Sequence, residues 1–212
     1  KTLSCQRVVL LACMPVCRTV STDALQVLLG VVPLDLEVIR RCITFRVKRG
    51  LSLGSIDWLV NDELNNMSVS ERKALLSECV ISRWQTRWND SVNGRVTYGF
   101  LPDVTFAMRR SDFSFGLSLG FLLTGHGSLN SFLHRRGLSM TPDCDCGNGH
   151  ESVRHVVMEC EFYTDIRHLE ELGVMMIDEV WSVSGALGTT VRLRKLNEFA
   201  CEVFRRRRCR VG

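Results

Sequence analysis

The sequence predicts a mostly α-helical protein, a multi-helix tail that carries a small CCHC-type zinc knuckle. Apolar residues recur at intervals of three and four along several segments, which is the spacing that places them on one face of a helix. Serine, threonine and glycine stand at the ends of these segments, where they cap helices. Cysteines and histidines that cluster within residues 144–160 add a candidate metal site.

In the first half of the chain, helices are expected over residues 5–13, 23–29, 33–49 and 69–91. Ser68 with Glu71 three residues later forms the pattern of a capping box, which predicts where the longest of these helices begins. Trp84 and Trp88 stand four residues apart and therefore share one helix face. We expect both rings to pack between helices; the alternative is a platform on which nucleic-acid bases stack.

The second half is also expected to be largely helical. The predicted elements are a short strand at 96–98, a helix over 115–123, a helix capped by Ser128, a helix over 162–172 and a last helix that Thr189 or Thr190 opens. Gly125 and Gly127 break the helical pattern on either side of His126. This histidine either meets a phosphate or a base, or is a loop histidine bonded to nearby backbone.

The cysteine and histidine cluster has the form Cys-x-Cys-x8-His-x4-Cys. Three thiolates and one imidazole form the ligand set of a closed tetrahedral zinc site, which predicts structural zinc on Cys144, Cys146, His155 and Cys160. His150 is an alternative ligand. Ordinary buried cysteines beside a surface histidine are the competing interpretation. The clustering argues against it, because three of the ten cysteines fall within seventeen residues.

Helical geometry places one condition on this zinc site. Five residues along a regular helix turn the side chain by about 140°. His155 and Cys160 therefore face one metal ion only if the helix between them begins late or ends before Cys160. The remaining cysteines are scattered along the chain, which suits a reducing, intracellular compartment better than a disulfide framework.

Positive charge is unevenly distributed, although the net charge is only +4. Arginine and lysine gather near the C-terminus and around residues 40–49, which suggests a polyanionic partner. The alternative is that these side chains solvate the outer faces of helices. The residues predicted to bind nucleic acid are Arg135, Arg136, Arg192, Arg194, Lys195, Arg205, Arg206, Arg207 and Arg208.

Two segments resemble parts of a known family. Residues 18–36 are similar to the region that follows the reverse transcriptase domain in non-LTR (LINE-type) retrotransposon polyproteins of arthropods, in particular the type-1 elements that insert into ribosomal RNA genes. Residues 123–137, followed by the cysteine and histidine pattern, resemble the C-terminal part of the same polyproteins. The resemblance covers essentially the whole chain, and it also maps the zinc ligands to Cys144, Cys146, His155 and Cys160.

The resemblance implies a parent Pol polyprotein with an endonuclease, a reverse transcriptase and this tail. The chain lacks the family's Tyr/Phe-x-Asp-Asp motif, so both catalytic centres and their magnesium ions are expected upstream. The tail is expected to bind template RNA or target DNA during target-primed reverse transcription, and to contact the upstream reverse transcriptase. Its expected location is intracellular and nuclear. No run of 18 apolar residues is present, so no membrane partner is expected.

The implied organisation has four parts: thumb-like helices over 1–67, a helical connector over 68–137, the knuckle over 138–170 and C-terminal helices with a basic run over 171–212. Two other functions compete with nucleic-acid binding. One is a helical module that zinc staples and that docks on the reverse transcriptase. The other is a restriction-like endonuclease, for which Pro102-Asp103 and Pro142-Asp143 are weak signals, because neither is followed by a clear acid-x-Lys pattern.

Overall fold

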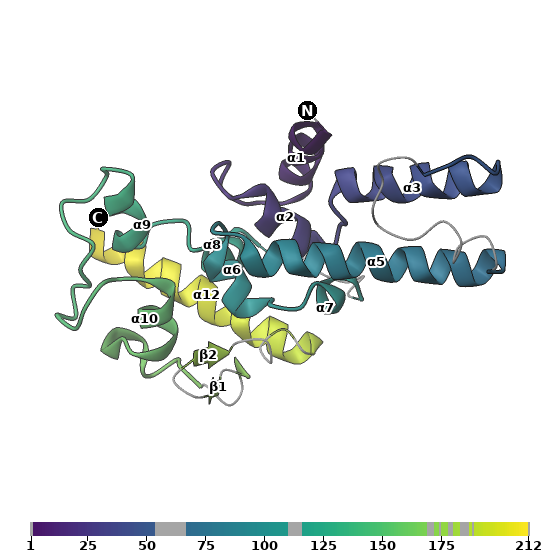
Figure 1. Cartoon of the computed structure of the whole chain (residues 1–212). Coiled ribbons are helices and arrows are strands. Elements are labelled where there is room, and N and C mark those ends of the chain that lie inside the picture. The colour runs from purple at the N-terminus through teal and green to yellow at the C-terminus, as the bar shows by residue number, and fades with distance from the viewer. Residues whose placement is uncertain are drawn as a thin grey trace.

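A computed structural model describes residues 2–53, 67–109, 116–168, 172–173, 175–177, 180–182, 187 and 189–211. Its larger helices are α1 (Thr2–Cys13), α2 (Thr22–Leu29), α3 (Leu34–Lys48), α5 (Val69–Asp90), α8 (Leu117–Thr124) and α12 (Thr190–Val211). The shorter ones are α6 (Arg95–Phe100), α7 (Val104–Met108), α9 (Asn130–Arg135), α10 (Val153–Met158) and the 3-10 turn η1 (Glu161–Tyr163). Helices dominate the structure (Figure 1), as the sequence predicts.

The main core is shared by segments from all parts of the chain. Helix α2 lies at its centre, with every residue from Ala24 to Leu28 buried. Trp84 and Trp88 on α5 are each 1% exposed, and the indole N–H of Trp88 donates to the carbonyl of Leu101 at 2.7 Å. Packing is therefore the role of both tryptophans. Helix α12 packs along α8 and carries the chain's end past the knuckle (Figure 1).

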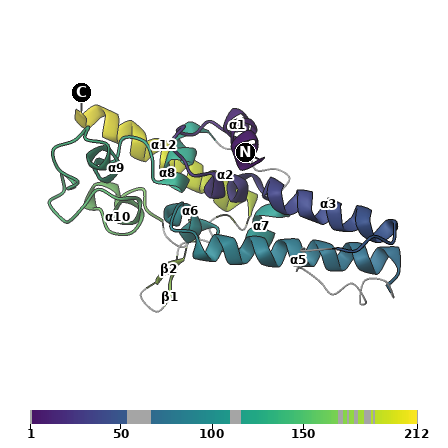
Figure 2. The ribbon, with the colours of Figure 1, turned by 45° about the horizontal axis from the view of Figure 1, so that its top comes forward.

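Helices α3 and α5 form an arm that projects from this core, side by side in both views (Figures 1 and 2). Near its base, Arg87 donates two hydrogen bonds to the carboxylate of Asp35, at 2.7 and 3.0 Å. Burial opposes ionisation of Asp35, but these bonds and the charge of Arg87 outweigh it and hold the pKa below its ordinary value. A separate apolar cluster of Ile43, Leu53 and Leu76 closes the arm.

The predicted start of α5 is confirmed. The Ser68 hydroxyl accepts the Glu71 N–H, and the Glu71 carboxylate accepts the Ser68 N–H, so the capping box is complete. The strand expected at 96–98 is wrong, because these residues lie in α6. Gly94 begins that turn with a φ of 69°, and the Thr97 hydroxyl bonds the carbonyl of Leu123. The chain's described strands are instead β1 (Met175–Ile177) and β2 (Val180–Ser182), paired antiparallel.

Two further expectations about helices are corrected. Helix α9 begins at Asn130 and has no cap from Ser128; the carboxylate of Glu151 accepts the Asn130 N–H instead, at 2.8 Å. The helix expected over 162–172 is not formed by the described residues 164–168, which follow η1 as a turn and irregular chain. Arg167 in this segment donates to the carbonyls of Met158 and Cys160, which ties the chain back to the knuckle. Residues 169–171 lie outside the described part.

Two leucines on α8 give a matched test of the core. Leu122 is fully buried, whereas Leu117 is 51% exposed. We expect Leu122→Ala to lower the free energy of unfolding by about 2–5 kcal/mol, because it leaves a cavity in the core. Leu117→Ala should lower it by less than about 1 kcal/mol. Urea denaturation measures both values, and equal losses would contradict this assignment of the core.

Candidate metal centre

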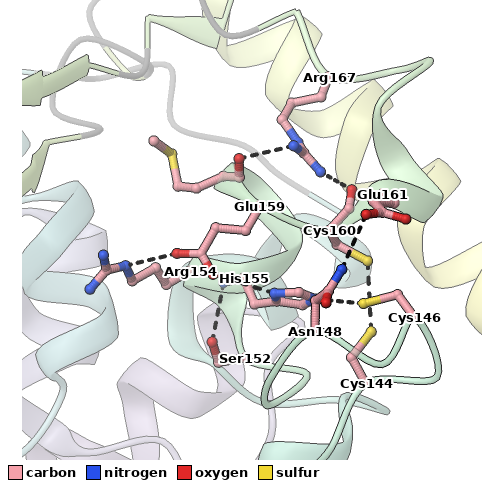
Figure 3. Close-up of polar contacts among 11 residues, drawn as sticks. Cys144, Cys146, Asn148, Ser152, Arg154, His155, Glu159, Cys160, Glu161 and Arg167 are labelled. Carbon is pink, nitrogen blue, oxygen red and sulfur yellow. Dashed lines mark hydrogen bonds and ion pairs between the residues drawn. The ribbon is translucent and has the colours of Figure 1, made fainter.

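The four predicted ligands converge on one point (Figure 3). One ligand atom from each of Cys144, Cys146, His155 and Cys160 lies within 4.8 Å of the others. Three of these residues are buried and Cys146 is half-buried. Among the residues that the structure describes, this is the single group of cysteine, histidine or carboxylate side chains that can hold a metal ion.

The distances fit a tetrahedral site. With zinc–sulfur bonds of about 2.3 Å, the edge between two sulfur atoms of a regular tetrahedron is about 3.8 Å. The sulfur atoms of Cys144 and Cys160 are 3.7 Å apart, and Cys146 Sγ lies 3.2 Å from His155 Nε2. Because a disulfide requires about 2.05 Å, Cys144 and Cys160 stand as two separate ligands.

Helix α10 meets the geometric condition by its length. It begins after Ser152, whose hydroxyl accepts the His155 N–H, and it ends at Met158. Cys160 lies beyond the helix with extended backbone angles (φ −62°, ψ 125°). Its amide still donates to the carbonyl of His155 at 2.8 Å. The helix therefore ends before Cys160, which lets the thiol turn back toward the imidazole.

The other two ligands come from a tight hairpin. The Cys144 amide donates to the carbonyl of Gly149 at 2.8 Å, and the Gly147 amide donates to the carbonyl of Cys144 at 3.0 Å. Gly147 and Gly149 have φ values of 82° and 87°. A Cβ at either position would meet no atom within 4 Å, so backbone angle and not space is what requires glycine here.

Backbone amides point at the sulfur atoms. The amides of Cys146, Asn148 and Phe162 donate to the sulfurs of Cys144, Cys146 and Cys160 respectively. Burial raises the pKa of the Cys144 and Cys160 thiols above the ordinary value. At Cys146 burial acts in the same direction but is outweighed by the Asn148 amide and the neighbouring thiols, so its pKa is lowered. Without a cation, the two buried thiols are therefore held neutral.

The structure separates the two candidate histidines. His155 is 3% exposed, directs Nε2 into the cluster and places Nδ1 3.4 Å from the carboxylate of Glu159. A carboxylate on the far nitrogen is the usual device that orients a metal-binding imidazole. His150 is exposed, and its Nδ1 contacts the carboxylate of Asp143 at 2.8 Å, outside the cluster. The geometry therefore favours His155 over His150.

A buried ion pair joins the knuckle to the end of α12. Glu151 is fully buried, and its carboxylate lies 2.9 Å from Nε of Arg207, which is itself 4% exposed. The guanidinium also donates to the side chain of Asn130 and the carbonyl of Ser128, and it lies 3.6 Å from Asp145. One arginine thus connects α12, α9 and the loop between the first two cysteines.

The predicted nucleic-acid-binding arginines do not form one surface. Arg205 and Arg206 both bond Glu202, and Arg206 also bonds Asp165, so these two have partners within the protein. Arg207 is buried against Glu151, and Arg194 pairs with Glu198. The predicted residues with exposed side chains fall into two groups. Arg135, Arg136, Arg205 and Arg208 lie on α9 and the end of α12, whereas Arg192 and Arg194 lie at the start of α12. Lys195 beside the second group is half-buried.

Sequence reasoning missed Glu151, Asn130 and Arg167 as supports of the site. A signal for Arg207 was present, because it continues the three- and four-residue spacing of the buried positions on α12. Those positions are Leu193, Leu196, Ala200, Val203 and Arg207. An arginine on a buried stripe indicates a buried carboxylate opposite it. The sequence does not say which carboxylate that is.

Fold and site together define a helical protein with a Cys₃His group that can bind a metal ion. Comparison with known proteins identifies relatives of the chain. The chain is 48% identical over 206 residues to the putative 115 kDa protein in type-1 retrotransposable element R1DM of Drosophila melanogaster. It is 45% identical over 203 residues to the Pol polyprotein from type-1 retrotransposable element R1 of Bradysia coprophila, and 41% identical over 202 residues to that from R1 2 of Nasonia vitripennis.

These matches cover 97%, 96% and 95% of the chain, but 20%, 20% and 49% of the three relatives. Over nearly its whole length the chain is thus homologous to a segment of the Pol polyproteins of type-1 retrotransposable elements, which confirms the resemblance to retrotransposon polyproteins. No protein-family model and no solved structure matches the chain. None of the described helices is both long and apolar enough to cross a membrane.

The cysteine and histidine variants test the metal centre. We expect the purified chain to contain about one zinc ion, because the four ligands fit a closed tetrahedral site. Cys144→Ser, Cys160→Ser and His155→Ala should each lose most of the zinc, measured by elemental analysis after dialysis. Cys201→Ser, at an exposed cysteine on α12, and His150→Ala should keep it. Loss of zinc in His150→Ala, with retention in His155→Ala, would reverse the choice of ligand.

Neighbouring arginines on α12 test the buried ion pair. Arg207→Met should lower the free energy of unfolding by about 3–5 kcal/mol, because it leaves the carboxylate of Glu151 buried without its partner. Arg208→Met makes the same change at an exposed position and should cost less than about 1 kcal/mol. Urea denaturation of both variants is the measurement, and a small loss for Arg207→Met would show that the pair contributes little.

Proposed function

We propose that this chain is the nucleic-acid-binding part of a retrotransposon Pol polyprotein. It holds template RNA or target DNA during target-primed reverse transcription, while the polymerase and endonuclease centres lie in other parts of the polyprotein. The observation that carries the proposal is the convergence of four zinc-type ligands beside an exposed group of arginines, in a chain homologous to Pol polyproteins. Because the proposed target is chromosomal DNA, we expect the chain to act in the nucleus.

Zinc is the metal that this ligand set favours. Thiolate and imidazole ligands in a closed tetrahedron suit zinc, and a structural zinc ion contributes directly to the free energy of folding. Bound zinc holds the hairpin of Cys144 and Cys146 against α10. The role of the four side chains is to hold this loop rigid, so that it presents backbone donors to unpaired bases.

The exposed arginines beside the knuckle supply the electrostatic part of binding. Arg135 and Arg136 are exposed at the end of α9, and Arg208 is exposed near the end of α12. Arg205 is also exposed there, but it pairs with Glu202. Figures 1 and 2 both place the end of α12 beside α9, and Arg207 ties this end to Glu151, which lies just before α10. Cations in such positions neutralise phosphates and release counterions, which makes affinity depend on salt.

Endonuclease activity finds little support in the described residues. Asp103 caps α7 through the amide of Thr105, and Asp143 accepts bonds from Thr141 and His150. Neither aspartate belongs to a group of three side chains that can hold a metal ion within the part of the chain that the structure describes.

A docking module is the second candidate function. Helix α1 exposes Val8 (70%) and Val9 (61%), together with Leu3 (38%), so it presents apolar surface that another part of a polyprotein can cover. This role is compatible with nucleic-acid binding at the opposite end of the chain. It becomes the main function if the purified chain binds a reverse transcriptase domain but no nucleic acid.

Salt-dependent binding tests the proposal. Fluorescence anisotropy with a labelled single-stranded RNA and a labelled duplex DNA, at several salt concentrations, gives the dependence of log K on log salt. We expect the double variant Arg136→Gln/Arg208→Gln to bind both more weakly and to reduce the magnitude of the slope by about 2, roughly one for each lost phosphate contact.

The matched control is Lys73→Gln/Arg109→Gln, which removes the same charge from exposed positions on α5 and at the end of α7. It should leave the slope nearly unchanged. Equal slopes for the two double variants would mean that binding follows net charge alone. Absence of binding to either nucleic acid in the zinc-loaded chain would leave the docking module as the function.

A further inference from the structure

A cavity of about 400 Å³ lies where three loops meet, and none of the four metal-site residues lines it. The loops are the one that leads into α2, the one between α5 and α6, and the one between α8 and α9. Its volume is within the range of about 300–1,000 Å³ that is usual for small-ligand sites. The polar side chains at its wall include those of Thr19, Ser21, Asn93, Arg95, His126 and Arg135.

These wall residues form a set of donors without a negative charge. Two arginines line the cavity, and no aspartate or glutamate is among the described residues that line it. Arg95 already donates to the carbonyls of Trp88 and Asn89, so the spare donors come from the other arginine and from Asn93. Arg135 uses its Nε for the carbonyl of Ser131, and its two Nη nitrogens make no hydrogen bond to a described residue. The side-chain amide of Asn93 likewise bonds no described residue. Uncompensated cations and spare donors of this kind are suited to an anion.

His126 is fixed at the wall by its own loop. Gly125 and Gly127 have φ values of 70° and 97°, and a Cβ at either would come within 2.8 Å of Val96 or Phe121. The imidazole Nδ1 lies 2.9 Å from the carbonyl of Thr124. A substitution of either glycine would therefore displace the histidine from the wall.

The surroundings of His126 are partly buried and positively charged. Burial lowers the pKa of His126, and the positive charges of Arg135 and Arg136 lower it further. The bonds to the carbonyls of Thr124 and Thr19 raise the pKa, but they do not outweigh these effects. Cations that face one cavity without a carboxylate repel one another. An anion that enters the cavity removes this repulsion and gains hydrogen bonds from the unused donors.

We infer that this cavity binds one phosphate-bearing nucleotide unit of a single-stranded nucleic acid, as a site separate from the metal centre. The inference rests on the proposed function, since it takes nucleic acid as the source of the phosphate. Arg135 binds the phosphate oxygens through its Nη nitrogens, and Asn93 donates from the opposite loop. The cavity is larger than a phosphate ion, so it also has space for the sugar or base that carries the phosphate.

The imidazole of His126 serves as a local reporter. Its ring signal in ¹H–¹³C spectra of the whole zinc-loaded chain, assigned by its loss in His126→Asn, is followed as thymidine dinucleotide with a 5′-phosphate is added. We expect a saturable shift. Inorganic phosphate, titrated in place of the dinucleotide, should bind at least about tenfold more weakly, as measured by the concentration that gives half of the shift. Equal affinities would show a site for free phosphate and overturn the inference.

Adjacent arginines provide the matched pair of variants. Arg135 lines the cavity, whereas Arg136 ends the same helix, is exposed and does not line it. Arg135→Gln should weaken dinucleotide binding at His126 about tenfold or more, as expected for loss of a charged hydrogen bond. Arg136→Gln should weaken it by less than about threefold. Equal weakening would assign the effect to general charge and overturn the inference.

The outcome is distinguishable from that of the proposed function. If the chain binds the long RNA with the salt dependence described above and His126 does not respond to the dinucleotide, the cavity is not a nucleotide site and the proposed function stands. If neither probe binds, both proposals fail.

Discussion

The ion pair between Arg207 and Glu151 is the contact that the rest of the knuckle region depends on. Glu151 follows the hairpin that carries Cys144 and Cys146, and precedes the helix that carries His155. Its carboxylate accepts from the first amide of α9 and from the guanidinium at the end of α12. Burial of both charges is costly in itself, so the pair depends on the further hydrogen bonds that Arg207 makes to Asn130 and Ser128 and that Glu151 accepts. The knuckle, α9 and α12 therefore keep one relative position.

A metal ion held by the Cys₃His group would fix residues that neighbour the ion pair in the sequence. The thiols of Cys144 and Cys160 are buried, so without a cation their pKa values are raised and the thiolate forms are disfavoured. A bound cation reverses this preference, and the backbone amides that point at the sulfurs are already in place. Folding and metal binding are consequently coupled. The loop is too short to form an apolar core of its own, which is why this coupling matters.

Arginines of one short run have different tasks. In the sequence Arg205–Arg208, successive residues are 100° apart around α12. Arg207 turns to the interior and Arg206 reaches Asp165, while Arg208 is exposed. Reasoning from composition assigns all four to nucleic acid. The structure shows that some of these arginines pair with carboxylates of the same chain, and such residues should not be assigned to a nucleic-acid-binding surface.

By itself, the sequence determined the helical class, the Cys₃His group that can hold a metal ion and the relationship to retrotransposon polyproteins. Apolar spacing, the capping box at Ser68 and the local Cys-x-Cys-x8-His-x4-Cys pattern are properties of nearby residues, and these do not require knowledge of the fold. Tertiary structure decided what distant residues do to one another. The choice of His155 over His150 depends on where α10 ends. Val96 lies in a helix although β-branched residues favour strands, because α6 packs against both α5 and α8. The partnership of Arg207 with Glu151 joins residues 56 positions apart in the sequence. No local pattern in the sequence predicts this pairing, because it depends on how α12 packs along α8.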